Sequence, residues 1–326
     1  MSNAEARTRL LAVIEELKRI AEMLPEDAKP VPQPQPKPPK GGAARPTIVP
    51  VFGLHGPPDF AYWGWTQEVY RRFELARPTV QSAFVMTGEP GHPVTGEQIR
   101  PLFNMGIQDV RARLAVPGEQ AGSPEQFVAY CRNSAVALYQ SGVRHFTIGN
   151  EPNFQHEGLG RGWQNGQQFG TFALRVRDML SAQMPDAIWH FPAPSPNHTA
   201  PIQEGVFLEQ ARSAIEELDW LDLHAYYWVF ENVDEQARRI AEIEKRFPNK
   251  PIAVTEHSCP NPDIPMEHKG HWHVDFVWRL ANYTRNVHVA YVFIVSGRQH
   301  WPHEAITDEV AAFYSGANVR AKLQIQ

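Results

Sequence analysis

The chain of 326 residues contains only two cysteines, Cys131 and Cys259. They could form one disulfide at most, and they lack metal-ligand spacing with each other. The cysteine content therefore does not indicate whether the protein resides in an oxidising or a reducing compartment. No apolar stretch approaches the roughly 20 residues that a membrane-spanning helix needs. The N-terminus also lacks the pattern of a secretory signal, because Glu5, Glu15 and Glu16 interrupt it. We therefore expect no membrane partner and, by default, a cytoplasmic location, with non-classical export or release by lysis as alternatives.

An excess of basic charge is also missing. The chain has 31 Lys and Arg against 36 Asp and Glu, which gives a net charge of −5 at pH 7. Proteins that bind nucleic acid normally carry a basic stripe, so we expect no nucleic-acid partner. Aromatic residues are plentiful, at 11% of the chain with 9 Trp, and their positions are therefore informative.

Three regions of the chain differ in composition. Residues 1–24 predict an amphipathic helix, with a capping box formed by Ser2 and Glu5 and an apolar heptad seam. Residues 25–46 are rich in proline and predict a semi-extended linker. The helix is either an arm that makes a homo-oligomer or a short helix that docks on its own domain. Residues 47–326 are predicted to form the main domain.

In the main domain, apolar strand-like runs alternate with amphipathic helical stretches. Eight strands are predicted, at residues 47–54, 80–87, 109–116, 143–150, 187–193, 220–226, 251–256 and 288–295. Helical patterns lie between them, as at 124–130 and 233–240, and a closing helix is expected near 304–315. Eight such units over roughly 270 residues match an α/β fold, the (β/α)8 TIM barrel. An open doubly wound sheet is the alternative, but no Gly-rich phosphate loop follows the first strand.

Two glutamates stand where predicted strands end. Glu151 follows the fourth strand, directly after Asn150, and Glu256 closes the seventh. Barrel enzymes carry their working groups at these carboxyl ends and in the loops that follow. Breaking a glycosidic bond typically requires two carboxyl groups, and two parallel strands of one barrel can supply them. The pair therefore predicts a glycosidase, with no cofactor and no metal.

Aromatic residues gather at the same strand ends. Indole and phenol rings stack on the apolar faces of sugars, while amides and charged groups bind the hydroxyls, so these positions predict a carbohydrate cleft. The alternative is that the tryptophans fill gaps between loops. The side chains predicted to contact substrate are Asn150, His224, Tyr226, His55, Trp63, Trp65, Arg113, Trp163, Trp228, Trp272 and Trp301.

The motifs at the strand ends carry a resemblance. Asn150-Glu151-Pro152-Asn153 on the fourth strand, His224-Ala225-Tyr226 on the sixth and Thr255-Glu256 on the seventh resemble the retaining glycoside hydrolases of clan A. They are most similar to glycoside hydrolase family 39 and its relatives. The resemblance covers residues from about 46 to the end of the chain, and it implies a poly- or oligosaccharide as substrate.

The resemblance implies a role for each matching residue. Glu151 would be the general acid/base, and Glu256 would be the nucleophile of a double-displacement mechanism. Asn150 would hold the 2-hydroxyl of the sugar at the cleavage site. Tyr226 would donate a hydrogen bond to the nucleophile, and His224 would line the same floor.

Two features depart from the clan's pattern. The second strand lacks the arginine that is common near the nucleophile, and Arg111 or Arg113 on the third strand could replace it. The aromatic residue often found at the end of the eighth strand is replaced by Ser296-Gly297-Arg298, unless Trp301 folds back into its place. These departures leave the sugar undetermined.

Three rival interpretations remain. Both glutamates could merely cap helix N-termini, where negative charge is favourable. The barrel could bind carbohydrate or serve in an assembly without cutting anything. A metal-dependent hydrolase is the third, because several potential ligands lie close in sequence, although their spacing fits no standard helical pair. Those ligands are Glu267, His268, His271, His273, Asp275, His300 and His303.

Overall fold

The computed structural model describes residues 49–58, 61–296 and 301–325. The helix predicted for residues 1–24 and the linker predicted for 25–46 lie outside the described residues, so both stay predictions. Within the described part of the chain, no helix combines the length and the apolar character needed to cross a membrane.

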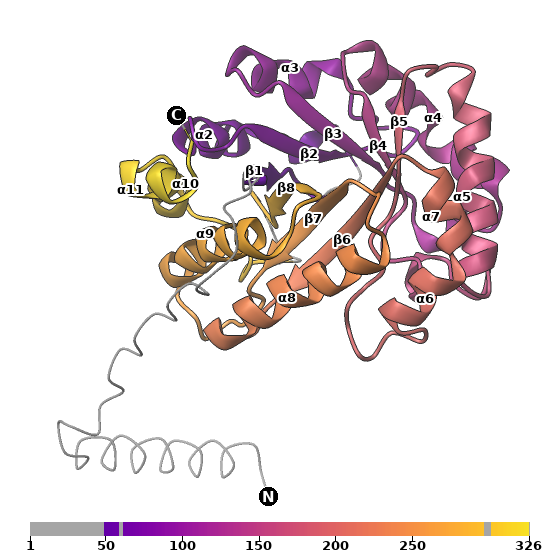
Figure 1. The fold of residues 1–326 in the computed structure, drawn as a ribbon. Coiled ribbons are helices and arrows are strands. Elements are labelled where there is room, and N and C mark those ends of the chain that lie inside the picture. Colours follow the sequence, from indigo (N-terminus) through magenta and orange to yellow (C-terminus); the bar gives the residue numbers. More distant parts are fainter. Residues whose placement is uncertain (1–48, 59–60, 297–300, 326) are drawn as a thin grey trace, which may run out of the picture. The chain divides into compact units, whose positions relative to one another are not determined.

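Eight parallel strands close into one barrel, in which each strand pairs with the next along the chain and β8 pairs with β1 (Figure 1). The eight strands are β1 Val51–His55, β2 Ser82–Met86, β3 Asp109–Leu114, β4 His145–Ile148, β5 Ile188–Phe191, β6 Trp220–Tyr226, β7 Ile252–Ser258 and β8 Val287–Val292. The predicted (β/α)8 TIM barrel is therefore confirmed, and each strand overlaps its predicted range. The fourth strand ends two residues early because Gly149, with φ of 87°, leaves the extended conformation.

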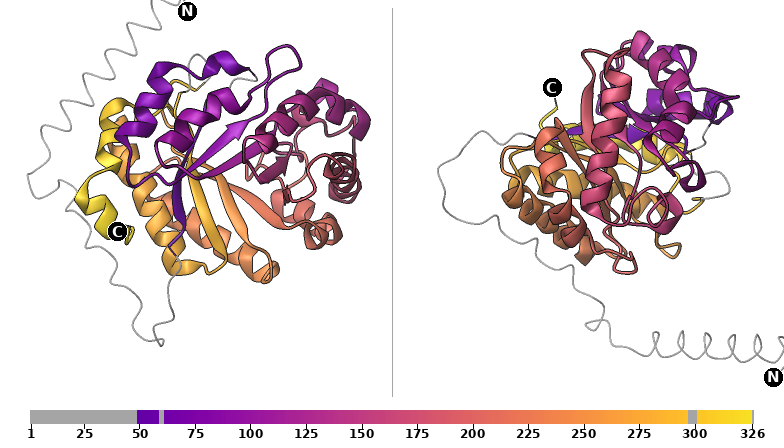
Figure 2. Two further views of the ribbon diagram at one scale, coloured as in Figure 1. Left: turned by 90° about the horizontal axis from the view of Figure 1, so that it is seen from above. Right: turned by 90° about the vertical axis from the view of Figure 1, so that its right-hand side faces the viewer.

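Helices follow the strands and cover the outside of the barrel (Figures 1 and 2). Among the described residues, the α-helices are α2 Gln67–Leu75, α3 Gly96–Asn104, α4 Pro124–Gln140, α5 Gly166–Ser181, α6 Glu204–Gln210, α7 Arg212–Glu217, α8 Phe230–Arg246, α9 Met266–Tyr283, α10 Asp308–Tyr314 and α11 Ala317–Lys322. Short 3-10 turns are η2 Tyr62–Gly64, η3 Gly118–Gln120 and η4 Gln155–Glu157. The predicted stretches 124–130 and 233–240 lie in α4 and α8. The predicted closing helix is α10, which packs between α2 and α9.

Residues along each strand alternate between two environments. In β6, for example, Leu221, Leu223 and Ala225 face the helices and belong to the main hydrophobic core, while Asp222 and His224 face the interior of the barrel. This alternation follows from the two-residue period of a strand. It places the large apolar core between sheet and helices and leaves the interior free to hold polar groups.

The lower half of the interior, at the amino-terminal ends of the strands, holds a paired polar network. Asp222 accepts hydrogen bonds from Thr147 Oγ1 at 2.5 Å and from His190 Nδ1 at 2.7 Å. His145 Nδ1 lies 2.9 Å from His190 Nε2, and the indole of Trp220 stacks on the His190 ring. Buried polar groups are tolerated when they are paired in this way, so we interpret this layer as part of the barrel's framework.

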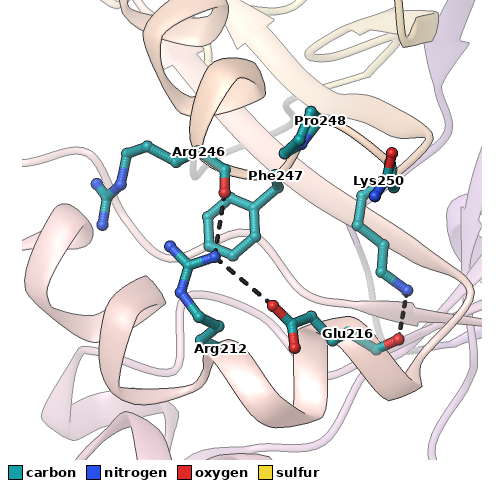
Figure 3. Close-up of a pocket in the computed structure, with 7 residues that line it drawn as sticks. Arg212, Glu216, Arg246, Phe247, Pro248 and Lys250 are labelled. Atoms are coloured by element: carbon teal, nitrogen blue, oxygen red, sulfur yellow. Dashed lines mark hydrogen bonds and ion pairs between the residues drawn. The ribbon is translucent and has the colours of Figure 1, made fainter.

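A cavity of about 300 Å³ also opens at the amino-terminal end of β7 (Figure 3). Its cationic side chains already have partners: Arg212 Nη1 donates to the Arg246 carbonyl at 3.1 Å, and Lys250 Nζ donates to the Glu216 carbonyl at 2.7 Å. Because Glu256 lies toward the other end of β7, this cavity is separate from the predicted site. It is lined by Arg212, Glu216, Arg246, Phe247, Pro248, Asn249 and Lys250.

Candidate active site

The fourth strand ends in a turn with unusual backbone angles. Gly149 has φ of 87°, and Glu151 has φ of 31°. A positive φ costs a residue with a side chain some free energy, and such residues cluster at active sites, where the surrounding structure holds them. Phe154 N–H donates to the Glu151 carbonyl at 2.9 Å and closes the turn. The strain is therefore localised at the glutamate that the sequence predicts to be catalytic.

A bulge in the seventh strand turns Glu256 into the barrel. Val254 belongs to the outer core, and strict alternation would point Glu256 the same way. The register between β6 and β7 shifts, however, so that Leu223 pairs with Val254 and His224 pairs with Glu256. An extra residue in a strand re-aims the side chains that follow it. Glu256 and His224 consequently enter the interior side by side.

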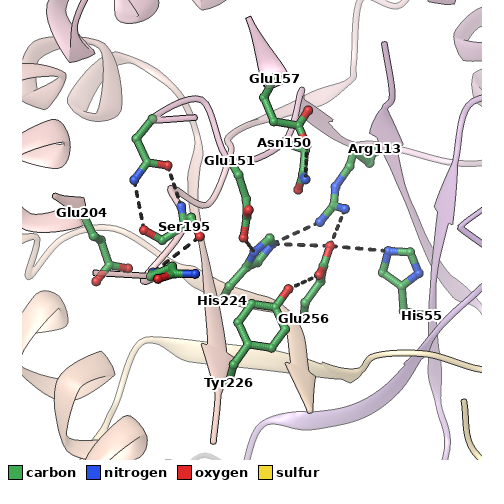
Figure 4. A network of polar contacts seen from close by, with 12 residues as sticks. His55, Arg113, Asn150, Glu151, Glu157, Ser195, Glu204, His224, Tyr226 and Glu256 are labelled. Carbon is green, nitrogen blue, oxygen red and sulfur yellow. Dashed lines mark hydrogen bonds and ion pairs between the residues drawn. The ribbon is translucent and has the colours of Figure 1, made fainter. Parts of the chain in front are cut away.

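Four side chains surround the Glu256 carboxylate (Figure 4). Arg113 on β3 places Nη1 at 2.5 Å from Oε1, and the hydroxyl of Tyr226, at the end of β6, donates to Oε2. Oε1 also lies 3.6 Å from His224 Nε2 and 4.0 Å from His55 Nε2. Both carboxylate oxygens are thus held before any substrate arrives.

The two arginines of β3 lie at different depths in the barrel. Arg111 donates to Asp109 Oδ1 at 3.1 Å, and its guanidinium lies 4.4 Å from the centre of the Trp220 ring. Arg113 is two residues further along and reaches Glu256. Of the two alternatives that the sequence offered, Arg113 therefore supplies the guanidinium beside the predicted nucleophile.

This environment sets the charges of the site. Burial by itself would raise the pKa of the Glu256 carboxyl, but the attraction of the groups around it outweighs burial and lowers that pKa to about 2. Burial also lowers the pKa of His55, to about 4. Near neutral pH, Glu256 is therefore an anion and His55 carries no charge.

Glu151 lies across the His224 ring from Glu256. His224 Nδ1 donates to Glu151 Oε1 at 3.0 Å, and on the other side of the ring Nε2 lies 3.2 Å from Arg113 Nη2. The Glu151 side chain is 14% exposed, against 6% for Glu256. The Glu256 carboxylate is thus enclosed by cationic and hydroxyl groups. The Glu151 carboxylate is held by the His224 ring and is more open to solvent.

Glu157 is a carboxyl beside Asn150 that no sequence pattern had indicated. Its Oε1 accepts a hydrogen bond from Asn150 Nδ2 at 2.9 Å. Burial raises the pKa of the Glu157 carboxyl to about 7, against the effect of that hydrogen bond, which lowers it. Glu157 lies in the turn η4, six residues beyond Glu151, and no strand or motif marks it, so pattern reasoning had no signal for it.

Glu304 is a second carboxyl that the sequence analysis missed. It accepts a hydrogen bond from the hydroxyl of Ser258, the last residue of β7. Burial raises its pKa to about 7, and the negative charge of Glu256 also raises it. Glu304 comes from the segment after β8, where the sequence offered an aromatic side chain and possible metal ligands but no catalytic carboxyl.

At the end of β8, Phe293 provides an aromatic ring that the sequence analysis overlooked. Its ring centre lies 5.2 Å from that of His55 and 5.5 Å from that of Trp301. Trp301 therefore packs against the end of the eighth strand, as one of the two sequence alternatives anticipated.

The predicted aromatic contacts fall into two groups. Trp63, at 44% exposed, and Trp228, at 56%, present large surfaces in the segments after β1 and β6. Trp65 and Trp272 are half-buried and pack against the main core, and Trp272 lies within helix α9 rather than at a strand end. Trp63 and Trp228 are the better candidates for stacking on a sugar.

For Trp163, the prediction of a substrate contact is wrong. The residue is 3% exposed, and its ring packs against Phe169 and Phe172 with centre separations of 4.7 Å and 5.0 Å. Its Nε1 donates to the Pro152 carbonyl at 2.6 Å. Trp163 therefore anchors the turn that carries Glu151 instead of facing a ligand.

We expect Trp163→Ala to lower the free energy of unfolding by about 3–5 kcal/mol, because it empties a packed site and leaves a carbonyl without its donor. Trp228→Ala is the matched control, since the exposed side chain should change stability by no more than about 0.5 kcal/mol. Denaturant unfolding of both variants gives the two values. Equal effects of the two substitutions would contradict this assignment.

The histidines considered as metal ligands point to different surroundings. His273 Nδ1 lies 2.7 Å from the Tyr314 hydroxyl, and the His271 ring packs on Phe313. Asp275 pairs with Lys322. Across the described residues, no group of three or more His, Cys, Asp or Glu side chains could hold a metal ion. His300 lies outside the described residues.

No protein-family model matches the chain, and no curated protein resembles it significantly in sequence. Solved structures of clan A glycoside hydrolases share its TIM-barrel fold. These structures do not single out family 39, so membership of that family stays a prediction.

Three of these structures illustrate the likeness. An exo-β-1,3-glucanase of glycoside hydrolase family 128 from Aureobasidium namibiae is 11% identical, with a TM-score of 0.53 over 86% of this chain and 97% of that one. An endo-1,4-β-D-mannanase from Thermotoga petrophila is 12% identical, with a TM-score of 0.56 over 85% and 100%. A modular endo-β-1,4-mannanase of family 26 from Cellulomonas fimi is 15% identical, with a TM-score of 0.56 over 83% and 71%. Identities this low describe a shared fold.

Proposed function

We propose that the protein is a retaining glycoside hydrolase that cleaves O-glycosidic bonds of a poly- or oligosaccharide. The observation that carries the proposal is the placement of Glu151 and Glu256 on either side of His224 in two different environments. Glycosidases of this kind use one carboxylate that attacks and one carboxyl group that gives up a proton. The same barrel in glucanases and mannanases supports the proposal.

Glu256 is the proposed nucleophile. Its carboxylate attacks the anomeric carbon while the bond to the leaving oxygen breaks, which forms a glycosyl ester on Glu256. Arg113 and Tyr226 hold the two oxygens, so the attacking group is fixed in position and ionised. Pre-organisation of this kind lowers the cost of reaching the transition state.

Glu151 is the proposed general acid and base. It donates its proton to the leaving oxygen in the first step. In the second step its carboxylate takes a proton from water, the resulting hydroxide attacks the anomeric carbon, and the ester bond to Glu256 breaks. The greater exposure of Glu151 suits this role, because both the leaving group and the water must reach it.

The test is a panel of polysaccharides that includes β-1,3-glucan and β-1,4-mannan, assayed by release of reducing ends. For the substrate that is cut, proton NMR of the first product should show the anomer of the starting bond, because two displacements restore the configuration. An inverted first product would contradict the double displacement. Binding of a polysaccharide without hydrolysis would favour a non-catalytic carbohydrate-binding protein instead.

A further inference from the structure

The side chain of Asn150 has one satisfied end and one unsatisfied end. Its Nδ2 donates to Glu157 Oε1 at 2.9 Å, whereas its Oδ1 is buried and has no hydrogen-bond partner. A buried acceptor without a partner costs free energy that a bound ligand can recover. Figure 4 shows Asn150 above the group formed by Arg113, Glu151 and Glu256.

Glu157 determines which end of the Asn150 amide is already hydrogen-bonded. A carboxylate can only accept hydrogen bonds, so it takes the NH2 group of Asn150 and leaves the carbonyl oxygen free. The Glu157 side chain is 20% exposed, and its Oε1 lies 3.8 Å from Nε2 of the exposed His156. Near neutral pH its carboxyl, with a pKa raised by burial to about 7, is ionised in a large share of the molecules.

The turn that carries Glu157 is held rigidly in place. A side-chain carbon added at Gly118 would lie 2.0 Å from the His156 carbonyl oxygen, so η3 and η4 touch through their backbones. Gly158 follows with φ of 121°, and a carbon there would lie 2.6 Å from the ring of Trp163. The position of Glu157 is thus fixed by backbone contacts, which a group that orients another side chain requires.

We propose that Glu157 is a positioning residue that turns the Asn150 amide so that its carbonyl oxygen accepts a hydrogen bond from a substrate hydroxyl beside the anomeric carbon. The inference rests on the proposed glycosidase activity and deepens it. It defines a substrate class: sugars whose hydroxyl next to the cleaved bond can donate. An orphaned acceptor strongly disfavours an analogue that lacks the donor.

The test uses three aryl glycosides, 4-nitrophenyl β-D-glucoside, 4-nitrophenyl β-D-mannoside and the 2-deoxy compound that corresponds to both. The readout is a selectivity ratio, kcat/KM for the better hydroxyl-bearing substrate divided by kcat/KM for the 2-deoxy compound. A ratio removes the intrinsic reactivity of the 2-deoxy sugar, because that factor is common to every variant. A merely structural role of Glu157 would lower both rates together and leave the ratio unchanged.

We expect Asn150→Ala and Glu157→Leu each to lower the selectivity ratio by roughly 10- to 100-fold. The double variant should fall no further than Asn150→Ala, since both changes remove the same interaction. Glu157→Gln should keep most of the selectivity, because its amide oxygen still accepts from Asn150 Nδ2. Circular dichroism and thermal unfolding confirm that each variant is folded, and Glu157→Ala replaces Glu157→Leu if that variant is not.

Three outcomes would overturn the inference, and the last is distinguishable from the first two. An unchanged ratio in both Glu157→Leu and Glu157→Ala, or additive losses in the double variant, would remove Glu157 from this role while the wild type remains a glycosidase. A wild type no more active than Glu256→Gln on all three compounds and on the polysaccharide panel would refute the proposed function, and the inference with it.

Discussion

Replacing Glu256 by glutamine should reduce the rate of hydrolysis by roughly 10⁴-fold or more, because the amide cannot form the glycosyl ester. The variant should nevertheless fold, since glutamine has nearly the same shape. Its amide oxygen can still accept from Arg113, and the Tyr226 hydroxyl can turn to accept from the amide NH2. The measurement is kcat on the polysaccharide that the panel identifies, with circular dichroism as the control for folding.

Azide separates the roles of the two glutamates. In Glu151→Ala, an aryl glycoside with a good leaving group still forms the ester on Glu256, and azide then attacks from the side that Glu151 vacated, which gives a product of retained configuration. In Glu256→Ala, azide takes the place of the nucleophile and reacts in one displacement, which gives the inverted product. Loss of the general acid should cost about 10²–10⁴-fold without azide.

Some results would overturn these assignments. Undiminished hydrolysis by Glu256→Gln would mean that Glu256 is not the nucleophile. The opposite pairing of azide products, inverted with Glu151→Ala and retained with Glu256→Ala, would mean that the two roles are exchanged. The assignment of Glu256 as the nucleophile is the stronger of the two expectations, because the groups around Glu256 stabilise an anion.

Replacing Arg113 by leucine should lower kcat/KM by about 10²–10³-fold, as the loss of one pre-organised donor does in other sites. It should also lower the free energy of unfolding by about 3–5 kcal/mol at neutral pH, because it leaves the Glu256 charge buried without its closest partner. Arg113→Lys is the matched control. It keeps the positive charge but loses the fork that reaches both Glu256 and His224.

The lowered pKa of Glu256 determines how the stability and kcat/KM of the protein change with pH. The pKa of Glu256 in the folded protein is about 2, below the ordinary value of 4.5. Its ionisation therefore stabilises the folded state above about pH 4.5, and this stabilisation is lost as the pH falls through about 2. Without the guanidinium the pKa rises, so the acid limb of the kcat/KM profile should move to higher pH in Arg113→Leu and less in Arg113→Lys. An acid limb that does not move in either variant would contradict the role of Arg113.

Much of the fold could be predicted from local patterns. Strands such as Trp220–Tyr226 were found because alternation and apolar runs depend on residues close in sequence. Gly149, Asn150 and Glu151 were placed at a strand end for the same reason. Prediction worked wherever the physical cause lay within a few residues of its effect.

Other features depended on contacts between distant segments. The two-residue period assigns Arg111 and Arg113 to one face, but only the register of β3 against its neighbours decides which of them reaches Glu256. Trp163 was mistaken for a sugar contact because its sequence position cannot reveal that helix α5 covers its ring. The bulge beside Glu256 is likewise defined by the pairing of β6 with β7.

The sequence by itself determined the barrel, the order of its strands and the two glutamates at their carboxyl ends, because these follow from short-range periodicity and from the geometry that parallel strands share. Only the tertiary structure decided the depth of each side chain, the partners of Glu256 and the pairing of Asn150 with Glu157. Those properties depend on barrel register and loop packing, which bring together residues as far apart as Arg113 and Glu256.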